Sequence, residues 1–435
     1  MITFVSLFLG LTLGVHQVEF LAHQEVASIE VFLDGEGLGT LSGPPWKMPC
    51  DFGSELTPHV LEAVAYDRGA REIGRERQWV NLPRQAAEVR AIFEERGEPG
   101  RNTIVRLRWE SLAGPSAPTI RAWFDGREVQ VKKQGEVELP AFDPAELHFF
   151  RAELEFAGNV ISSFETTLEG TFSDRVESEL TAVLLDVRQK TIQAEDLQGL
   201  LVKDGAPLDV VAIDKPPAEI VVVRDRAAER ALIRIATQRL LDFGPMGSTS
   251  NRSRLNRALE SKVFDWNLHF LWPVAQRREG AGQRFDLFPH SPELGPSDGS
   301  IFAFLTRVPF PENLVGRQRL AEALAVAGVS VASLRGRRAA VLLVDQNSID
   351  ASDLEGEIVR RYLADIQVPL HVWRTGKESS DEWGKAQRIH PRSQLDLAWR
   401  NLLENLDRQR VAWVRGRHLP QDIELTPTRG LELVR

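Results

Sequence analysis

The first third of the chain repeats one pattern of alternating apolar and polar residues. Residues 29–38 read I-E-V-F-L-D-G-E-G-L, and residues 120–129 read I-R-A-W-F-D-G-R-E-V. Both runs reach Asp-Gly, which favours a hairpin because its tight turn needs positive φ. A second alternating run follows each hairpin at nearly the same offset, at 59–67 and 148–156. The pattern predicts two modules of strands, each strand with one buried and one wet face.

Two tandem β-sandwiches account for this spacing of strands and turns. Residues 16–83 and 84–172 resemble bacterial immunoglobulin-like domains in this respect. The second run of each module begins with a histidine, His59 or His148. These histidines belong to separate modules and have no local partner ligand, so we interpret them as strand-start residues and not as metal ligands.

Beyond residue 215 the pattern changes to short apolar runs set among helix-like segments. Residues 219–225 (E-I-V-V-V-R-D) and 339–345 (A-A-V-L-L-V-D) each end on an aspartate. Such runs suit strands buried on both faces of a parallel sheet. Because ligands bind at the carboxyl ends of these strands, we expect Asp225 and Asp345 at a functional rim.

Further periodic segments extend this α/β pattern. They predict helices at 226–243, 317–332, 352–366 and 393–406, and strands at 262–272, 368–373 and 410–414. Strands that alternate with amphipathic helices require a doubly wound parallel sheet. We therefore predict a multidomain chain: two all-β immunoglobulin-like sandwiches, a β lead-in at 173–214 whose long strand spans 176–187, and an α/β, Rossmann-like domain at 215–435.

The lead-in carries a family resemblance. A strand ends on Asp-Val at 186–187, and the chain then continues through Val-Lys-Asp-Gly at 202–205. With the ordered elements that follow, residues 176–415 resemble bacterial proteins related to the von Willebrand factor type A (VWFA) domain. The resemblance implies a site where a divalent cation is bound by Asp-x-Ser-x-Ser, a threonine from a second loop and an aspartate after the fourth strand. Such oxygen ligands suit Mg²⁺.

This chain departs from that metal-binding pattern. After Asp225, Ala227 and Glu229 stand in place of the two serines. The loop expected to supply the threonine, at 309–317, contains no hydroxyl, and Gln346 stands where glycine is usual. We therefore expect a degenerate site with no metal and no cofactor.

Arginines provide another way to neutralise the acidic residues of the rim. Arg224 and Arg226 flank Asp225, and Arg317 ends the loop at 309–317. We expect these arginines to neutralise the carboxylates, as ion pairs commonly do. The insertion at 277–300 is predicted to lack regular structure, and such long loops are usually functional or mobile. Its Phe285 and Phe288 are either anchors for a partner or a flap packed on the domain.

Composition excludes several classes of function. A net charge of -9 opposes general nucleic-acid binding. The single cysteine, Cys50, excludes an internal disulfide and every multi-cysteine metal site, and its Pro-rich turn favours an inert thiol. Residues 1–15 are a signal peptide or a first strand, because the apolar run is short for a membrane span of ~20 residues. We expect a periplasmic or extracellular protein, and otherwise a cytoplasmic one.

The sequence contains no G-x-S-x-G, His-Glu-x-x-His, P-loop or G-x-G-x-x-G. The hydroxyl-rich acidic run at 345–353 is explained by capping of the next helix through Ser352 or Asp353. The prediction is a non-catalytic interaction, adhesion or assembly protein that binds another protein. The predicted binding residues are Asp225, Arg226, Glu229, Asp345, Arg317, Phe285 and Phe288. A hydrolase that uses the acidic rim and a purely structural cell-envelope component are the alternatives.

Overall fold

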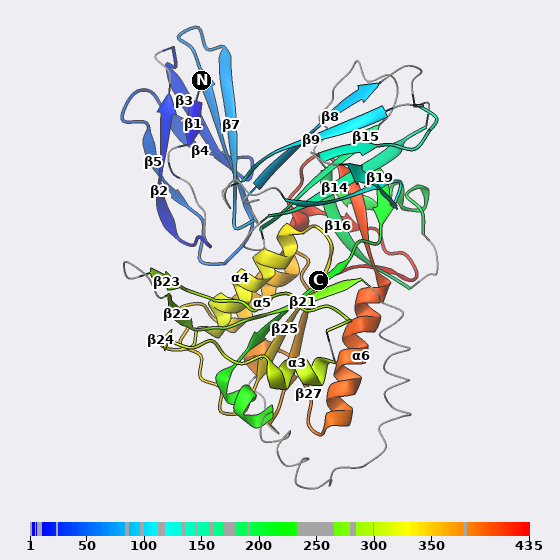
Figure 1. Ribbon diagram of the computed structural model, residues 1–435. Helices are drawn as coiled ribbons and strands as arrows, with labels where there is room; N and C mark the ends of the chain where they lie inside the picture. The colour runs from blue at the N-terminus through cyan, green and yellow to red at the C-terminus, as the bar shows by residue number, and fades with distance from the viewer. Residues whose placement is uncertain are drawn as a thin grey trace, which may run out of the picture.

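The computed structural model divides the chain into three β units and one α/β unit (Figure 1). It describes residues 2–4, 6, 11–22, 25–82, 87–95, 100–101, 103–111, 118–132, 135–144, 146–156, 160–168, 180–188, 192–232, 265–278, 284–298, 300–376 and 381–435. No helix within these ranges is long and apolar enough to cross a membrane.

The first β unit is a sandwich of two antiparallel sheets. One sheet has the order β1-β2-β5 and the other β4-β3-β6-β7. The strands are β1 (Ile2–Phe4), β2 (Val15–Ala22), β3 (Ser28–Leu33), β4 (Glu36–Leu41), β5 (Lys47–Asp51), β6 (His59–Tyr66) and β7 (Glu72–Val80). Ile2 and Phe4 are buried in this core, so the described part of the N-terminal segment is a strand. Export of the protein stays a prediction.

The second β unit repeats the arrangement with the sheets β11-β10-β14-β15 and β12-β13-β9-β8. Its strands are β8 (Ala87–Glu95), β9 (Thr103–Ser111), β10 (Thr119–Phe124), β11 (Arg127–Val129), β12 (Val131–Lys132), β13 (Glu136–Glu138), β14 (His148–Phe156) and β15 (Val160–Leu168). Both predicted Asp-Gly hairpins are confirmed. Asp34 and Asp125 have φ of 52° and 49°, and the glycine after each also has positive φ. The N-terminal part of the chain therefore consists of immunoglobulin- or fibronectin-III-like sandwiches.

The lead-in forms a third β unit together with the C-terminal residues. Its sheets have the orders β19-β28-β16-β30 and β18-β17-β29. The strands are β16 (Leu180–Val187), β17 (Leu201–Lys203), β18 (Ala206–Pro207), β19 (Val210–Asp214), β28 (Gln409–Arg415), β29 (Glu424–Leu425) and β30 (Leu431–Leu433). The predicted strand 176–187 is described only from residue 180.

This pairing corrects one prediction. The strand predicted at 410–414 was placed in the parallel sheet, but β28 pairs antiparallel with β16 and β19. Its residues 411–414 are all buried, because β28 is a central strand covered on both faces. A continuous apolar run therefore had the same appearance as a strand of a parallel sheet.

The α/β unit is built on a five-stranded parallel sheet with the order β21-β20-β25-β26-β27. The strands are β20 (Ala218–Arg224), β21 (Trp266–Leu271), β25 (Arg337–Val344), β26 (Leu370–Arg374) and β27 (Ala386–Arg388). In chain order this is 2-1-3-4-5, so the sheet winds in opposite directions on the two sides of the β20–β25 pair. Such a switch point leaves a crevice at the carboxyl ends of the two strands.

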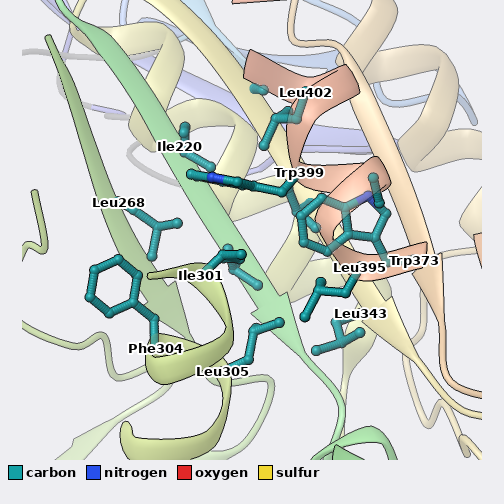
Figure 2. Packing of buried hydrophobic residues seen from close by; sticks show 14 of the residues in the cluster. Ile220, Leu268, Ile301, Phe304, Leu305, Leu343, Trp373, Leu395, Trp399 and Leu402 are labelled. Carbon is teal, nitrogen blue, oxygen red and sulfur yellow. The ribbon is translucent and has the colours of Figure 1, made fainter. Parts of the chain in front are cut away.

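Helices cover both faces of this sheet. On one face lie residues 226–232, α3 (Ile301–Arg307) and α6 (Arg392–Arg408); on the other lie α4 (Leu320–Ser333) and α5 (Gly356–Asp365). Figure 2 shows side chains of α3 and α6 meeting those of β20, β21 and β25 on the first face. Short 3-10 turns occur at Glu195–Leu197, Asp381–Trp383 and Pro420–Asp422. The first predicted helix begins at residue 226 as expected, and its residues 233–243 lie outside the described residues. The helices predicted from 317 and 352 begin later, at residues 320 and 356, and the one predicted from 393 begins at residue 392.

Part of the long insertion has regular structure, contrary to the prediction. β22 (Ala275–Arg278), β23 (Arg284–Asp286) and β24 (Leu314–Val315) form a small antiparallel sheet beyond the end of β21. Helix α3 follows the insertion and was missed, because seven residues are too few for a helical period to stand out.

Two adjacent buried arginines connect the start of β25 to the helices. Arg337 donates to the carbonyl of Leu406 at the end of α6 (3.1 Å). Arg338 donates to the carbonyls of Gln367 (2.9 Å), Ile366 (3.3 Å) and Ala332 (3.3 Å), near the ends of α5 and α4. Successive strand residues point to opposite faces, so each guanidinium meets the helix ends on its own face.

Candidate functional site

Asp225 follows β20 at the switch point, and its side chain is buried. Its Oδ2 atom accepts hydrogen bonds from the backbone N–H of Ala227 (3.1 Å) and Ala228 (3.2 Å). This is the geometry of a helix N-cap, in which a carboxylate satisfies the first free N–H groups of a helix. Asp225 is therefore used in starting the helix at residue 226.

Gln318 holds the other oxygen of Asp225. Its Nε2 atom donates to Asp225 Oδ1 (2.7 Å), and its Oε1 atom accepts from the backbone N–H of Arg226 (2.8 Å). The loop that was expected to supply a hydroxyl at 309–317 stops one residue before this glutamine. Sequence reasoning missed it, since glutamine is an ordinary residue before a helix.

Ser348 joins the two aspartates. Its hydroxyl donates to Asp225 Oδ2 and accepts from the backbone N–H of Asp345 (2.8 Å). Asp345 accepts from the side-chain and backbone N–H groups of Asn347 (3.1 and 3.2 Å) and from the hydroxyl of Thr375. The structure thus confirms that Asp225 and Asp345 lie together, with neutral donors around both carboxylates.

This donor set does not fit the divalent cation that the type A resemblance implies. A bound Mg²⁺ needs several oxygen ligands free to face it. Here an amide N–H of Gln318 faces Asp225 Oδ1, and Ser348 and two backbone N–H groups face Oδ2. Among the described residues there is no group of three or more His, Cys, Asp or Glu side chains placed to hold a metal.

The arginines do not neutralise the aspartates as predicted. Arg224 is buried and points to the carbonyls of Leu305 (3.1 Å) and Val308 (2.6 Å), with Glu229 Oε1 at 3.5 Å. Rings of Phe270 and Phe310 lie within 4.9 and 5.2 Å of its guanidinium. Burial lowers the pKa of Arg224 to about 10, partly offset by Glu229.

The remaining arginines of the rim are on the surface. Arg226 contributes only its backbone N–H to Gln318, and its side chain is exposed. Arg317 is also exposed. The structure therefore separates the predicted set: the buried Asp225 and the half-buried Asp345 share a hydrogen-bond network, while Arg226 and Arg317 face solvent.

The acidic run after β25 caps a helix, but not the one predicted. Asp350 accepts from the backbone N–H of Leu320 (2.8 Å), and the Ser352 hydroxyl accepts from that of Ala321 (2.9 Å). Both belong to α4, thirty residues earlier in the chain. The residue before α5, Glu355, makes no side-chain capping bond. The prediction that these Asp and Ser side chains cap a helix is confirmed, but the helix that they cap is α4 and not α5.

The aromatic residues of the insertion have different positions. Phe288 is half-buried against the core that contains α4 and α5, which supports the packed-flap interpretation for this residue. The backbone of Phe285 lies in β23, and its side chain lies outside the described part of the structure. Three apolar side chains are exposed here: Leu287 (61%), and, elsewhere on the rim, Val315 (42%) and Ile349 (73%).

A repeated His–Asp pair was also missed. Asp34, in the first hairpin turn, accepts from the backbone N–H of Val60 (2.7 Å) and lies 2.7 Å from His59 Nδ1. Asp125 is paired in the same way with His148 Nδ1 (2.7 Å), and it accepts from the backbone N–H of the residue after His148 (2.8 Å). The inference that these histidines lack local partners was wrong. The matched spacing of Asp-Gly and His in the two repeats was the available signal.

Comparison with known proteins leaves the family open. No protein family and no curated protein matches this sequence. The fibronectin(III)-like modules of Clostridium thermocellum CbhA share 15% identity at a TM-score of 0.17, over 18% of this chain and 93% of theirs. The central fibronectin-III array of RIM-binding protein shares 10% identity at a TM-score of 0.19, over 45% and 81%. Immunoglobulin domains 1–4 of Sidekick-1 share 14% identity at a TM-score of 0.14, over 39% and 48%.

Likenesses of this strength carry no argument about function. The fold rests instead on the strand pairing: sandwiches at the N-terminal end and a parallel sheet with interleaved helices after them.

Proposed function

We propose that this chain is a non-catalytic protein-binding protein whose α/β unit is a degenerate type A domain. The observation that carries the proposal is the occupation of the switch-point crevice by the protein's own side chains. Gln318 and Ser348 fill the hydrogen-bonding positions around Asp225 that a ligand would otherwise use. A rim closed in this way is suited to contact with a macromolecule and not to coordination.

The exposed residues around the closed crevice supply the contact surface. Ile349 follows Ser348 directly and is 73% exposed, and Val315 and the exposed Arg317 precede Gln318. Exposed apolar side chains beside arginine are typical of protein interfaces. Tandem sandwiches before such a domain would hold it away from other parts of an assembly, in a periplasmic or extracellular setting.

Hydrolysis by the acidic rim has less support. A general acid or base must reach the proton that it transfers. Asp225 is buried, and its oxygens accept hydrogen bonds from four groups of the protein. The rim thus presents no free aspartate oxygen from β20 for that role.

Affinity capture tests the contact surface. The full chain and an Ile349→Asp/Arg317→Glu variant are compared as baits in extracts of the source cells, with bound proteins quantified by mass spectrometry. The matched control is Leu397→Asp/Lys385→Glu, which makes the same charge changes at exposed positions beyond the rim. A partner lost with the rim variant and retained with the control supports the proposal. Equal retention by all three baits contradicts it.

Calorimetric titration tests the degenerate site. The purified chain is titrated with Mg²⁺ and with Mn²⁺, and so is Asp225→Ala. We expect no stoichiometric binding to either protein. Micromolar binding by the wild type that is lost in Asp225→Ala would show a working metal site and would overturn this part of the proposal.

A further inference from the structure

A closed polar junction lies at the opposite end of the parallel sheet, where β20 begins. A cavity of about 10 Å³, roughly one water position, is lined there by Arg151, Glu153, Pro217, Glu219, Leu334 and Gly336. The first two residues belong to β14 of the second sandwich, and the others belong to the α/β unit or the residue just before it. The cavity is therefore formed between the second sandwich and the α/β unit.

Ion pairs lie around the same junction, and the Arg335–Glu165 pair joins the second sandwich to the α/β unit. Arg151 is 2% exposed and contacts Asp214 Oδ2 and Glu153 Oε2, each at 3.2 Å. Arg335, just after α4, contacts Glu165 Oε2 of β15 at 2.9 Å. Glu153 and Glu165 of the second sandwich are thus already paired with arginine.

Glu219 has no ion pair with an arginine among the described residues. It is 6% exposed, and its Oε1 atom accepts from Asn267 Nδ2 at 3.0 Å. Its Oε2 atom has no hydrogen-bond partner among the described residues. A buried polar atom without a partner costs about 1–3 kcal/mol, and a buried charge costs more. The arrangement favours the neutral carboxyl.

The surrounding charges reinforce this preference. Glu293 and Glu153 are acidic groups that raise the pKa of Glu219, and Arg121 is a cation that lowers it. Arg121 is itself bound to Glu153 Oε1 at 2.6 Å. Burial raises the pKa of Glu219 to about 8, against a hydrogen bond from Asn267 that lowers it, and Glu293 and Glu153 raise it further. Other charged groups around the junction are Arg151, Glu155, Glu165, Asp214, Asp265, Arg335 and Arg338, the last being the β25 residue in register with Glu219.

We propose that Glu219 is a proton-operated latch: its neutral carboxyl permits the second sandwich to dock on the α/β unit, and its ionisation loosens the junction. The proposal is independent of the function of the rim. It assigns a conformational role to a residue at the end of the sheet that faces away from Asp225.

The direction of the pH effect follows from linkage. In the open junction Glu219 is solvated and titrates near its ordinary value of 4.5, and in the closed junction it titrates near 8. Between these values the closed state holds a proton that the open state releases. The equilibrium constant for opening should therefore rise about tenfold per pH unit from about pH 5 to pH 8 and then level off.

Hydrogen exchange measured by mass spectrometry tests the latch. Full-length wild type and Glu219→Gln are compared at the same pH values from 5 to 9, so that the intrinsic pH dependence of exchange cancels. Glutamine keeps the size of the neutral carboxyl and carries no charge. In peptides from β14 and β20, the ratio of wild-type to variant opening should be near one at pH 5. It should then rise up to tenfold per pH unit and be constant above pH 8. Peptides from β3 and β6 should show no such rise.

Two further variants make the test specific. Glu322→Gln removes another buried carboxylate, one whose pKa is lowered by hydrogen bonds despite its burial. A lowered pKa places any pH dependence of its effect below its ordinary value of 4.5, so the ratio for Glu322→Gln should stay flat from pH 5 to 9. Asn267→Leu removes the bond that favours ionised Glu219 and should move the plateau to higher pH, which tests the proposal even if Glu219→Gln folds poorly. A ratio that does not change with pH, or an equal rise in β3 and β6, would overturn the latch.

Discussion

Replacing Gln318 by glutamate places a second carboxylate against Asp225. The amide nitrogen of Gln318 lies 2.7 Å from Asp225 Oδ1, while its oxygen accepts from the N–H of Arg226. Gln318→Glu keeps the shape and the second bond, and it exchanges a donor for a negative charge. The change therefore tests whether this amide stabilises the Asp225 carboxylate in the place of a cation.

The size of the effect can be estimated from this geometry. Two like charges about 3 Å apart repel by about 5 kcal/mol at an effective dielectric constant of about 20. A proton taken up by one carboxyl relieves the repulsion, and at pH 7 this uptake costs about 4 kcal/mol for a carboxyl of ordinary acidity. The free energy of unfolding of Gln318→Glu should thus be lower than that of wild type by about 4 kcal/mol at pH 7. The deficit should shrink by about 1.4 kcal/mol for each pH unit toward pH 5.

Urea unfolding followed by tryptophan fluorescence measures this difference at pH 5, 6 and 7, with and without Mg²⁺. With two carboxylates facing each other, Gln318→Glu should gain stability from the ion, by about 2.7 kcal/mol at a concentration 100 times the dissociation constant. Gln318→Leu is the control: it leaves Asp225 Oδ1 without its donor at a cost of about 1–3 kcal/mol, and Mg²⁺ should not restore it.

Two outcomes would refute the reasoning. If Gln318→Glu is as stable as wild type at pH 7, the amide does not hold Asp225 in solution. If Mg²⁺ stabilises the wild type, the rim binds a cation, and the hydrogen bonds around Asp225 do not exclude one.

Two further predictions concern residues outside the rim. Arg338→Met should lower the free energy of unfolding by about 3 kcal/mol, because three bonds from a charged donor to helix ends are lost while the cost of burying the charge is relieved. Arg307→Met, at an exposed position, should lower it by at most about 1 kcal/mol in the same urea titration. Equal losses in the two variants would contradict the role of Arg338. In Asp125→Asn, the loss of thermal stability should be largest below about pH 6. Burial alone would lower the pKa of His148, but the bond to Asp125 raises it. The pair therefore stabilises the fold below the pKa of the unfolded state, and this stabilisation is lost as the pH rises through the pKa of the folded state. Asp204→Asn, at an Asp-Gly turn of the third β unit, should be indifferent to pH, and a pH-independent loss in Asp125→Asn would contradict the pairing.

Local sequence patterns determined much of the fold. Asp-Gly between two alternating runs sufficed for the hairpins at Asp34 and Asp125, since the turn, its positive φ and the facing of the strands all depend on neighbouring residues. The apolar runs that end at Asp225 and Asp345 likewise predicted strands of a parallel sheet, and the structure confirms both. In each case the information lies within ten residues or so of the chain.

Partner choice depended on the tertiary structure. A run buried on both faces looks alike in a parallel and an antiparallel sheet, so the place of β28 beside β16 could not be read from its residues. Gln318 meets Asp225 from 93 residues away and Ser348 from 123, and a hydrogen bond between distant residues leaves no periodic trace in either segment. Glu219 is, in the sequence, only an acidic residue at the start of a strand, and the β14 residues that line a cavity with it lie more than sixty residues earlier in the chain. Periodicity records which face of an element is buried; what covers that face, and which charges meet there, is set only when the elements pack.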